Sequence, residues 1–257
     1  MPPCLIQQTV AIFGASDNML KFGSLGLDCL TTGVIIEEIA RTSNTRLVGP
    51  NCMGVLNAAS HAVGTFASSF ERGWPKTGSI SIISQSGAVG GHIMVLARER
   101  GIGIRNWITT GNEVDVDVAD CIAYWAEDPE TKVIAAYMEG TKKPEQLKAA
   151  FAAARANGKA IVMMKVGASE VGAHAVNSHT ASLAGADAIY DAMFRRYSIC
   201  RVYSMDEMLY VAAAAATGQF PGRNRLGIVT ISGGIGVLTS DTAALHDLEV
   251  PELPAKA

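Results

Sequence analysis

The sequence predicts an α/β protein with a doubly wound parallel sheet. Short runs rich in β-branched residues recur along the chain, and they are mainly continuous rather than alternating apolar runs, which is typical of strands buried on both faces. Segments rich in alanine, leucine and glutamate alternate with these runs, and strand–helix alternation implies a parallel sheet covered by helices. The expected strands are "TVAIFG" (9–14), "TRLVG" (45–49), "SISIIS" (79–84), "KVIAAYM" (132–138), "AIVMMKV" (160–166) and "LGIVTIS" (226–232).

Composition narrows the class of protein. Of the 257 residues, 49% are hydrophobic and 18% are charged, so the chain can bury a sizeable core. The net charge of −3, without a cluster of lysine or arginine, argues against nucleic-acid binding. No apolar run reaches the roughly 18 residues that span a membrane. Five scattered cysteines without a CxxC pair favour a cytoplasmic protein with neither disulfides nor a metal site.

Two helices are well marked in the middle of the chain. Residues 88–100 form the first, and Gly101 is placed as its C-terminal cap. Residues 116–128 form the second, with Asp115 and Asp117 near its beginning. These two aspartates either complement the helix dipole or ligate a metal.

Both ends of the sequence look shortened. The strand at 9–14 opens a nucleotide-binding βαβ unit, but only one helix is expected before the strand at 45–49, and a full unit needs several strands. Likewise, the strand at 226–232 and a helix at 235–245 begin a unit that nothing continues. We therefore expect a shortened Rossmann-like unit over 1–57, a central domain over 76–218, and the beginning of a further domain over 225–257.

Two expected helix N-termini follow strands directly and are rich in glycine and serine. Free backbone N–H groups and the helix dipole both favour an anion at such a position. Packing alone also produces strand–glycine–helix turns, so each is a hypothesis only. The candidate phosphate-binding residues are Ser84, Gln85, Ser86 and Gly87 at one end, and Ser232, Gly233 and Gly234 at the other.

The segment "NSHTASLAG" (177–185) places His179 among small side chains that a substrate can approach. Neutral imidazole is a competent nucleophile toward phosphorus. Such a histidine needs a partner to hold the proton on its other nitrogen. Glu139, at the carboxyl end of an expected buried strand, can do this or can be a solvated loop residue.

Four segments together resemble a known family. "GPNCMGVLN", "SISIISQSGAVGG", "TTGNEVDVDVADCIAYWAEDPETKVIAAYMEG" and "SHTASLAG" occur in the order typical of nucleoside-diphosphate-forming acyl-CoA synthetases. This family of ADP-forming acid–CoA ligases is related to the α subunit of succinyl-CoA synthetase. The resemblance implies a flavodoxin-like central domain and a CoA-binding Rossmann-like domain before it.

The resemblance also implies roles for particular residues. His179 would be the transient phosphohistidine and Glu139 the carboxylate that steadies it, with the two helix ends holding phosphate. "GASDNMLKFG" is similar to the family's coenzyme A turn. The implied cofactor-binding residues are Gly14, Ser16, Asp17 and Lys21 of that turn, with Asn51 of the "GPNC" signature.

The implied reaction interconverts acyl-CoA, ADP and phosphate with a carboxylic acid, CoA and ATP, through an acyl phosphate. ATP, ADP and Mg²⁺ would bind an ATP-grasp partner domain or subunit, and the resemblance implies an oligomer that uses CoA and a small carboxylic acid. By itself the 257-residue chain is expected to bind CoA weakly and to lack synthetase activity. A catalytically inactive remnant or regulatory CoA-binding module is the alternative. An NAD-type oxidoreductase is disfavoured because no GxGxxG spacing follows the first strand.

Overall fold

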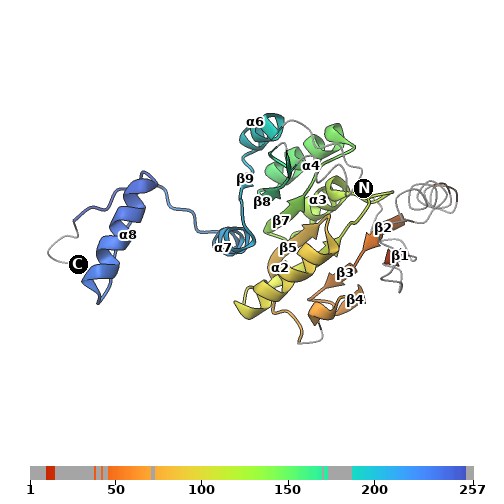
Figure 1. Cartoon of the computed structure of the whole chain (residues 1–257), viewed down its shortest axis with the longest axis horizontal. Coiled ribbons are helices and arrows are strands. Elements are labelled where there is room, and N and C mark those ends of the chain that lie inside the picture. Colours follow the sequence, from red (N-terminus) through yellow and green to blue (C-terminus); the bar gives the residue numbers. More distant parts are fainter. Residues whose placement is uncertain are drawn as a thin grey trace. The chain divides into compact units, whose positions relative to one another are not determined.

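The structure is a computed structural model in which the chain divides into two compact units, Met1–Gly218 and Gln219–Ala257. Each unit is described by itself (Figure 1). The described residues are 10–14, 38, 42, 46–70, 73–169, 171–172 and 187–252.

The first unit is built on a seven-stranded sheet with the strand order β4-β3-β6-β5-β7-β8-β9. The five strands from β6 to β9 in this order run parallel, which confirms the predicted parallel core. β3 and β4 add an antiparallel pair at one edge. The strands are β3 (Gly54–Asn57), β4 (Ala62–Thr65), β5 (Thr77–Ser84), β6 (Ile104–Thr109), β7 (Val133–Met138), β8 (Ala160–Lys165) and β9 (Cys200–Arg201).

The sequence pattern missed four of these strands for a physical reason. β3, β4 and β9 are only two to four residues long, too short to show a pattern. β6 interrupts its apolar run with Arg105 and Asn106, which are paired on the protein rather than solvated. Arg105 binds the Asp128 carboxylate at 2.7 Å, and Asn106 donates to the Ser81 hydroxyl at 2.8 Å.

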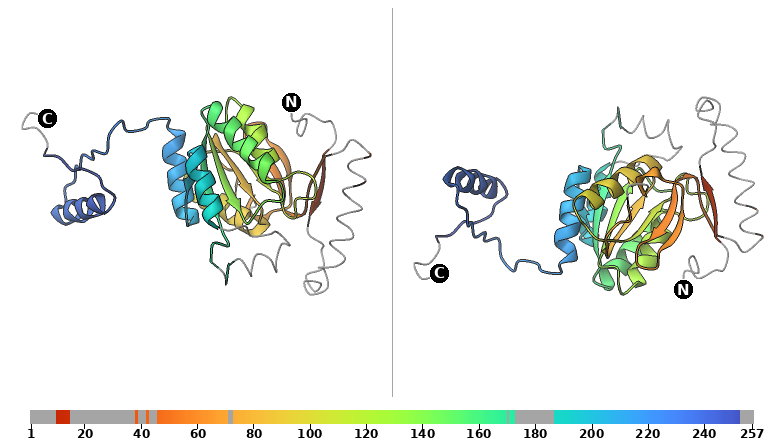
Figure 2. Two further views of the ribbon diagram at one scale, coloured as in Figure 1. Left: turned by 90° about the horizontal axis from the view of Figure 1, so that it is seen from above. Right: turned by 90° about the horizontal axis from the view of Figure 1, so that it is seen from below.

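Helices cover both faces of the sheet (Figure 2). Trp125, Phe151 and Phe194 lie in the core on the face of α3, α4 and α6. Trp107 and Leu209 lie in the core on the face of α2 and α7. The helices of this unit are α2 (Gly87–Glu99), α3 (Val118–Glu127), α4 (Pro144–Ala156), α6 (Asp187–Tyr197) and α7 (Met205–Ala216), with a 3₁₀ turn, η2 (Ser68–Phe70).

The end of α2 confirms the predicted glycine cap. Gly101 has φ of +64° and donates its N–H to the Arg98 carbonyl, while Ile102 donates to the Ala97 carbonyl. This pair of bonds is a Schellman motif, which satisfies the last carbonyls of the helix.

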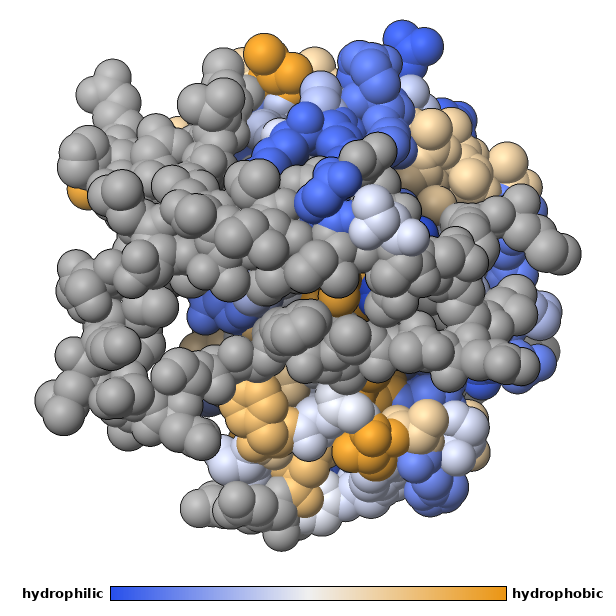
Figure 3. All heavy atoms as spheres, turned by 90° about the vertical axis from the view of Figure 1, so that its right-hand side faces the viewer, coloured by the Kyte–Doolittle hydropathy of each residue, from blue (hydrophilic) through white to orange (hydrophobic). Residues whose placement is uncertain are grey.

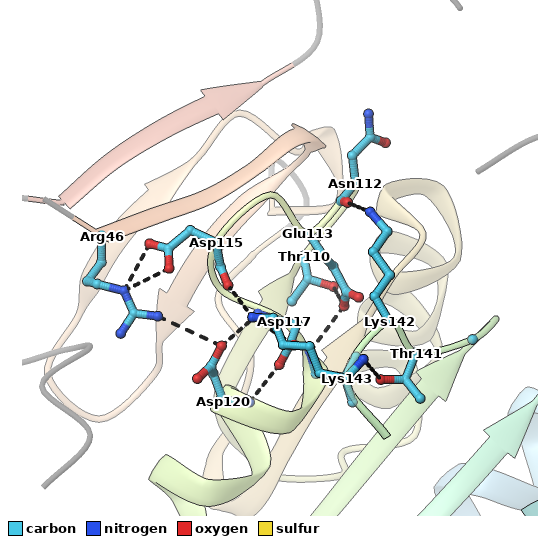
Figure 4. Close-up of polar contacts among 12 residues, drawn as sticks. Arg46, Thr110, Asn112, Glu113, Asp115, Asp117, Asp120, Thr141, Lys142 and Lys143 are labelled. Carbon is cyan, nitrogen blue, oxygen red and sulfur yellow. Dashed lines mark hydrogen bonds and ion pairs between the residues drawn. The ribbon is translucent and has the colours of Figure 1, made fainter. Parts of the chain in front are cut away.

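At the start of α3, both aspartates are bound by other groups of the protein. Asp117 accepts the Asp120 N–H at 2.9 Å and the Asp120 side chain accepts the Asp117 N–H, so the two form a capping box. Asp115 accepts from the Arg46 guanidinium instead (Figure 4). Both aspartates therefore serve the protein itself, and the described residues contain no cluster of three or more potential metal ligands.

Two more strands form a separate parallel pair before the large sheet. β1 (Val10–Gly14) lies beside β2 (Arg46–Cys52), with Val10 opposite Arg46 and Gly14 opposite Cys52. The predicted strands at 9–14 and 45–49 are confirmed, and the second continues to Cys52. On the side shown in Figure 3, both hydrophilic and apolar side chains of the described residues are visible.

The second unit differs from the prediction. Its helix α8 (Gly233–Leu245) begins after Ser232 as expected, but residues 226–232 form no strand. Only an isolated bridge joins Arg225 and Glu249 there. An apolar run becomes a strand only when neighbouring strands satisfy its backbone groups. The described residues of this unit provide no neighbouring strand, and Val229 and Ile231 are exposed.

Among the described residues, no helix is both long enough and apolar enough to cross a membrane.

Candidate functional site

The parallel part of the sheet has the order β6-β5-β7-β8-β9. The strand that follows β5 in the sequence, β6, lies on one side of it, and the later strands β7 to β9 lie on the other side. In open α/β sheets, ligands bind beyond the carboxyl ends of the strands where the order reverses. That point lies between β5, which ends at Ser84, and β7, which ends at Met138. Gln85 and Glu139, both predicted site residues, follow these two strands directly and are brought together here.

Gln85 joins the two strand ends through its side-chain amide. Its Oε1 accepts the backbone N–H groups of Glu139 at 2.5 Å and Gly140 at 3.2 Å. Its Nε2 donates to the Gly140 carbonyl at 2.8 Å and to Glu113 Oε2 at 2.7 Å. Its backbone N–H donates to the Tyr137 carbonyl at 3.2 Å. All donors of Gln85 are thus used within the protein, so an anion at this edge would have to be bound by neighbouring residues.

The neighbouring donors are at the start of α2, which Ser86 caps. The first N–H groups of an α-helix have no acceptor within the helix. The Ser86 hydroxyl accepts one of them, the Val89 N–H, at 3.3 Å, and the N–H groups before Val89 have no intrahelical acceptor. Gly90 lets the helix approach the sheet, because a Cβ there would lie 2.7 Å from Thr109 Cγ2 and 2.9 Å from Ser84 Cβ. The N-terminus of α2 is therefore held directly beside the ends of β5 and β6.

The Glu139 carboxyl group is buried just after the end of β7. The residue is only 6% exposed, and its Oε2 is buried without a hydrogen-bond partner among the described residues. Burial, together with the charge and a hydrogen bond of Glu139, raises the pKa of Tyr137 to about 12. A buried carboxylate oxygen without a donor costs free energy. Glu139 is therefore poised to accept a hydrogen bond from a further group.

Glu113 is a site residue that the sequence analysis missed. Its carboxylate accepts from the Thr110 hydroxyl at 2.8 Å, the Val118 N–H at 3.0 Å and Gln85 Nε2 at 2.7 Å. Figure 4 shows Glu113 beside Thr110. Burial is the main cause that raises the pKa of Glu113 to about 7, and the nearby charge of Asp117 raises it further. The hydrogen bond from Thr110 opposes this shift. In the sequence, "TGNEVD" looks like an ordinary polar loop, and no local pattern distinguishes Glu113 from a solvated glutamate.

The raised pKa of Glu113 predicts a pH dependence of stability. In the unfolded chain this carboxyl releases its proton near pH 4.5, whereas the folded protein holds it until about pH 7. Between these pH values the folded state binds a proton that the unfolded state has released. The contribution of this group to the free energy of unfolding is therefore fully present below pH 4.5 and is lost as the pH rises through 7. We expect wild-type stability, relative to Glu113→Gln, to fall by up to about 1.4 kcal/mol per pH unit in that window.

Denaturant unfolding of both proteins at several pH values between 4.5 and 8.5 measures this difference. Glu130→Gln removes an exposed carboxylate and is the matched control. A stability difference between wild type and Glu113→Gln that stays constant with pH would contradict the prediction.

Lys165 is a second residue that the analysis missed. It ends β8, is 3% exposed, and its Nζ donates to the Val166 carbonyl at 2.5 Å and lies 4.6 Å from the centre of the Tyr190 ring. Burial lowers the pKa of this ammonium group, although Asp187 opposes the shift. A lysine inside the continuous apolar run 160–166 was the available signal.

The "GPNC" segment lies against the loop that follows β6. Asn112 donates its N–H to the Pro50 carbonyl at 2.9 Å, and Asn51 Nδ2 donates to Asn112 Oδ1 at 3.3 Å. Gly111 has φ of +60°, and a Cβ there would lie 2.2 Å from the Pro50 oxygen. The end of β2, with the predicted Asn51, is thereby placed beside the loop that carries Glu113.

This close approach predicts that Gly111→Ala is strongly destabilising. Left-handed backbone costs about 1–2 kcal/mol for a residue with a Cβ, and the overlap with Pro50 adds to this cost. We expect the free energy of unfolding to fall by more than about 2 kcal/mol, measured by denaturant titration. Gly158→Ala is the control, because Gly158 has φ of +66° but open space around its Cβ position. Equal losses in both variants would show that the contact with Pro50 is unimportant.

The remaining predicted residues are placed as follows. Gly14 ends β1, opposite Cys52. At the second helix end, the Ser232 hydroxyl accepts the Ile235 N–H at 3.5 Å, and α8 starts at Gly233 and Gly234 in the other unit. Ser16, Asp17, Lys21 and His179 lie outside the described residues.

Comparison with known proteins identifies the fold of the first unit. Residues 77–215, more than half of the chain, match the family described as the succinyl-CoA ligase like flavodoxin domain. The chain belongs to this family. Its flavodoxin domain spans β5 to α7 and contains both strand ends at the candidate site.

Relatives that share this flavodoxin domain include ADP-forming ligases. The chain is 38% identical over 215 residues to an ADP-forming acetate–CoA ligase of Methanocaldococcus jannaschii, a match covering 84% of this chain and 30% of the relative. It is 36% identical to the α subunit of ADP-forming acetate–CoA ligase II of Pyrococcus furiosus, covering 91% of this chain and 50% of the relative.

A solved structure is also similar. The chain matches the dinucleotide-forming acetyl-coenzyme A synthetase 1 of Ca. Korarchaeum cryptofilum, in complex with phosphate and ADP, with a TM-score of 0.82 and 30% identity. The match covers 96% of this chain and 51% of that one. The chain thus spans about half or less of the length of these relatives.

Proposed function

We propose that this chain is the α-type part of an NDP-forming acyl-CoA synthetase. It would interconvert acyl-CoA, ADP and phosphate with a carboxylic acid, CoA and ATP. The observation that carries the proposal is that buried Glu139, at the switch point of the sheet, has an Oε2 without a hydrogen-bond partner among the described residues, while the N-terminus of α2 follows the neighbouring strand end. An acceptor for an imidazole N–H and a site for an anion are the two elements that a phosphohistidine needs.

In this proposal, Glu139 accepts a hydrogen bond from one imidazole nitrogen of His179. The other nitrogen, which then carries a lone pair, attacks the phosphorus of an acyl phosphate. The phosphorus–oxygen bond breaks and the carboxylate leaves with its electron pair. The Ser86 cap and the first N–H groups of α2, from Gly87 onward, stabilise the negative charge of the transferred phosphoryl group.

The other steps require further groups. CoA would contact Gly14, Ser16, Asp17, Lys21 and Asn51, and phosphate would displace it from acyl-CoA to form the acyl phosphate. An ATP-grasp domain or subunit, carrying Mg²⁺, would pass the phosphoryl group from His179 to ADP. Ser232, Gly233 and Gly234 would form a second phosphate-holding helix end. The two relatives compared above are named as acetate–CoA ligases, which suggests a small acid such as acetate.

The alternative is an inactive remnant or regulatory CoA-binding module of the same fold. The two candidates differ in whether the protein takes up a phosphoryl group.

Incubation of the chain with acetyl phosphate labelled in the phosphoryl group tests the proposal without an ATP-grasp partner. A second arm uses an ATP-grasp partner, Mg²⁺ and γ-labelled ATP. We expect a protein-bound label that is lost in acid and kept in base, as is characteristic of phosphohistidine. A protein that takes no label in either arm, yet binds CoA in titration calorimetry, would be the regulatory module instead.

A further inference from the structure

We propose that Glu113 is a positioning residue that holds Glu139 in its working orientation through Gln85. This inference rests on the proposed function, since it assigns a role within the same phosphoryl-transfer site. Glu113 would touch neither the substrate nor the reacting atoms.

The hydrogen bonds form a chain across three parts of the sheet edge. Glu113, in the loop after β6, accepts from Gln85, which follows β5, and Gln85 accepts from the Glu139 N–H after β7. Gln85 is 7% exposed, so solvent cannot readily replace a lost partner. Losing one link leaves a buried polar group unsatisfied, which is unfavourable.

Glu113 also favours one of the two orientations of the Gln85 side-chain amide. An amide has an acceptor at one end and a donor at the other, and its two orientations differ by half a turn. In the observed orientation, Oε1 meets the N–H groups of Glu139 and Gly140, and Nε2 meets Glu113 Oε2. The reverse would place NH₂ against two N–H donors and an oxygen against the carboxylate. Glu113 and the Gly140 carbonyl, which both accept from Nε2, therefore favour the orientation that binds the backbone of Glu139.

The other contacts of Glu113 fix it in turn. The Thr110 hydroxyl and the Val118 N–H at the start of α3 both donate to Oε1, which leaves Oε2 for Gln85. The nearby charged group is Asp117, whose carboxylate is bound by the Asp120 N–H and lies 3.3 Å from Lys143 Nζ. The relay thus starts from a helix N-terminus whose own cap is complete, and it ends at the backbone of Glu139.

The test substitutes Glu113→Gln, which keeps the shape but cannot satisfy both sides. If its oxygen faces Thr110 and Val118, its NH₂ faces the NH₂ of Gln85. We expect the rate constant of labelling by saturating acetyl phosphate to fall about ten- to a hundredfold, the loss typical of a slightly misplaced catalytic group. The half-saturating concentration of acetyl phosphate should not change, because Glu113 does not contact the substrate.

A double-mutant cycle with Gln85→Met shows whether the effect passes through Gln85. Residues that act along one chain of hydrogen bonds are non-additive. The double variant should therefore label no more slowly than the slower single variant. Glu130→Gln, which changes an exposed carboxylate in the same way, should label at the wild-type rate.

Three outcomes would overturn the inference: a wild-type labelling rate in Glu113→Gln, a raised half-saturating concentration without a rate loss, or multiplied losses in the double variant. Failure of wild type itself to take label would instead remove the proposed function, and the inference with it. If Glu113→Gln does not fold by circular dichroism, Glu113→Asp carries the same expectation. Aspartate keeps the charge but is one methylene too short to span Thr110, Val118 and Gln85 together.

Discussion

His179→Ala should abolish the phosphoryl label that the wild-type chain takes from acetyl phosphate. Alanine offers no nucleophilic nitrogen, and the other groups proposed at the site only bind or orient. Loss of a nucleophile leaves no covalent intermediate to detect. The label is measured on the intact protein after a chase in acid and in base, and the modified peptide is then located by mass spectrometry.

The matched control for this variant is His174→Ala, five residues earlier in the same small-residue stretch. It should keep the label, because the assignment depends on His179 itself and not on an imidazole somewhere in the segment. A label that persists in His179→Ala, or disappears only in His174→Ala, would assign the phosphoryl group to another residue.

Glu139→Gln should slow phosphorylation by roughly 10²-fold or more, the loss typical of removing a positioned acid–base group. Glutamine keeps the shape of the side chain but removes the charge that stabilises an imidazolium and fixes its proton. Glutamine keeps an oxygen that can accept the hydrogen bond from Tyr137, and Oε2 of Glu139 has no partner among the described residues that the substitution would remove. We therefore expect little change in the free energy of unfolding.

Single-turnover labelling beside denaturant unfolding separates the two effects for Glu139. Glu130→Gln is the control, since it makes the same change at an exposed position. Equal labelling rates in wild type and Glu139→Gln would return Glu139 to a structural role. A large loss of stability would show that its buried charge is satisfied by the fold.

Much of the sheet could be predicted from the sequence because its inner strands are buried on both faces. The runs at 79–84, 132–138 and 160–166 became β5, β7 and β8, and burial on both faces explains the contiguous apolar residues of the last two. The run at 226–232 has the same composition but formed no strand among the described residues. Composition can show that a segment suits a strand, but only neighbouring strands make it one.

The residues of the candidate site also differ in whether the sequence alone could identify their roles. Ser86 and Glu139 could be found because each directly follows a recognisable strand, and strand ends of a parallel sheet meet at one edge. Glu113 and Gln85 could not be understood from their neighbours in sequence, because their partners lie 28 to 55 residues apart.

The sequence by itself determined the fold class, the parallel core, the caps of α2 and the resemblance to ADP-forming acyl-CoA synthetases. These depend on local periodicity, on single capping residues and on short contiguous motifs, all of which are readable along the chain. Only the tertiary structure shows that the Gln85 side chain joins the ends of β5 and β7 through hydrogen bonds and that Glu113 accepts a further hydrogen bond from it. Only the tertiary structure shows that Asp115 and Asp117 are each bound by other groups of the protein. A hydrogen bond depends on the distance and direction between two groups, and for residues far apart in sequence these are set only when the sheet assembles.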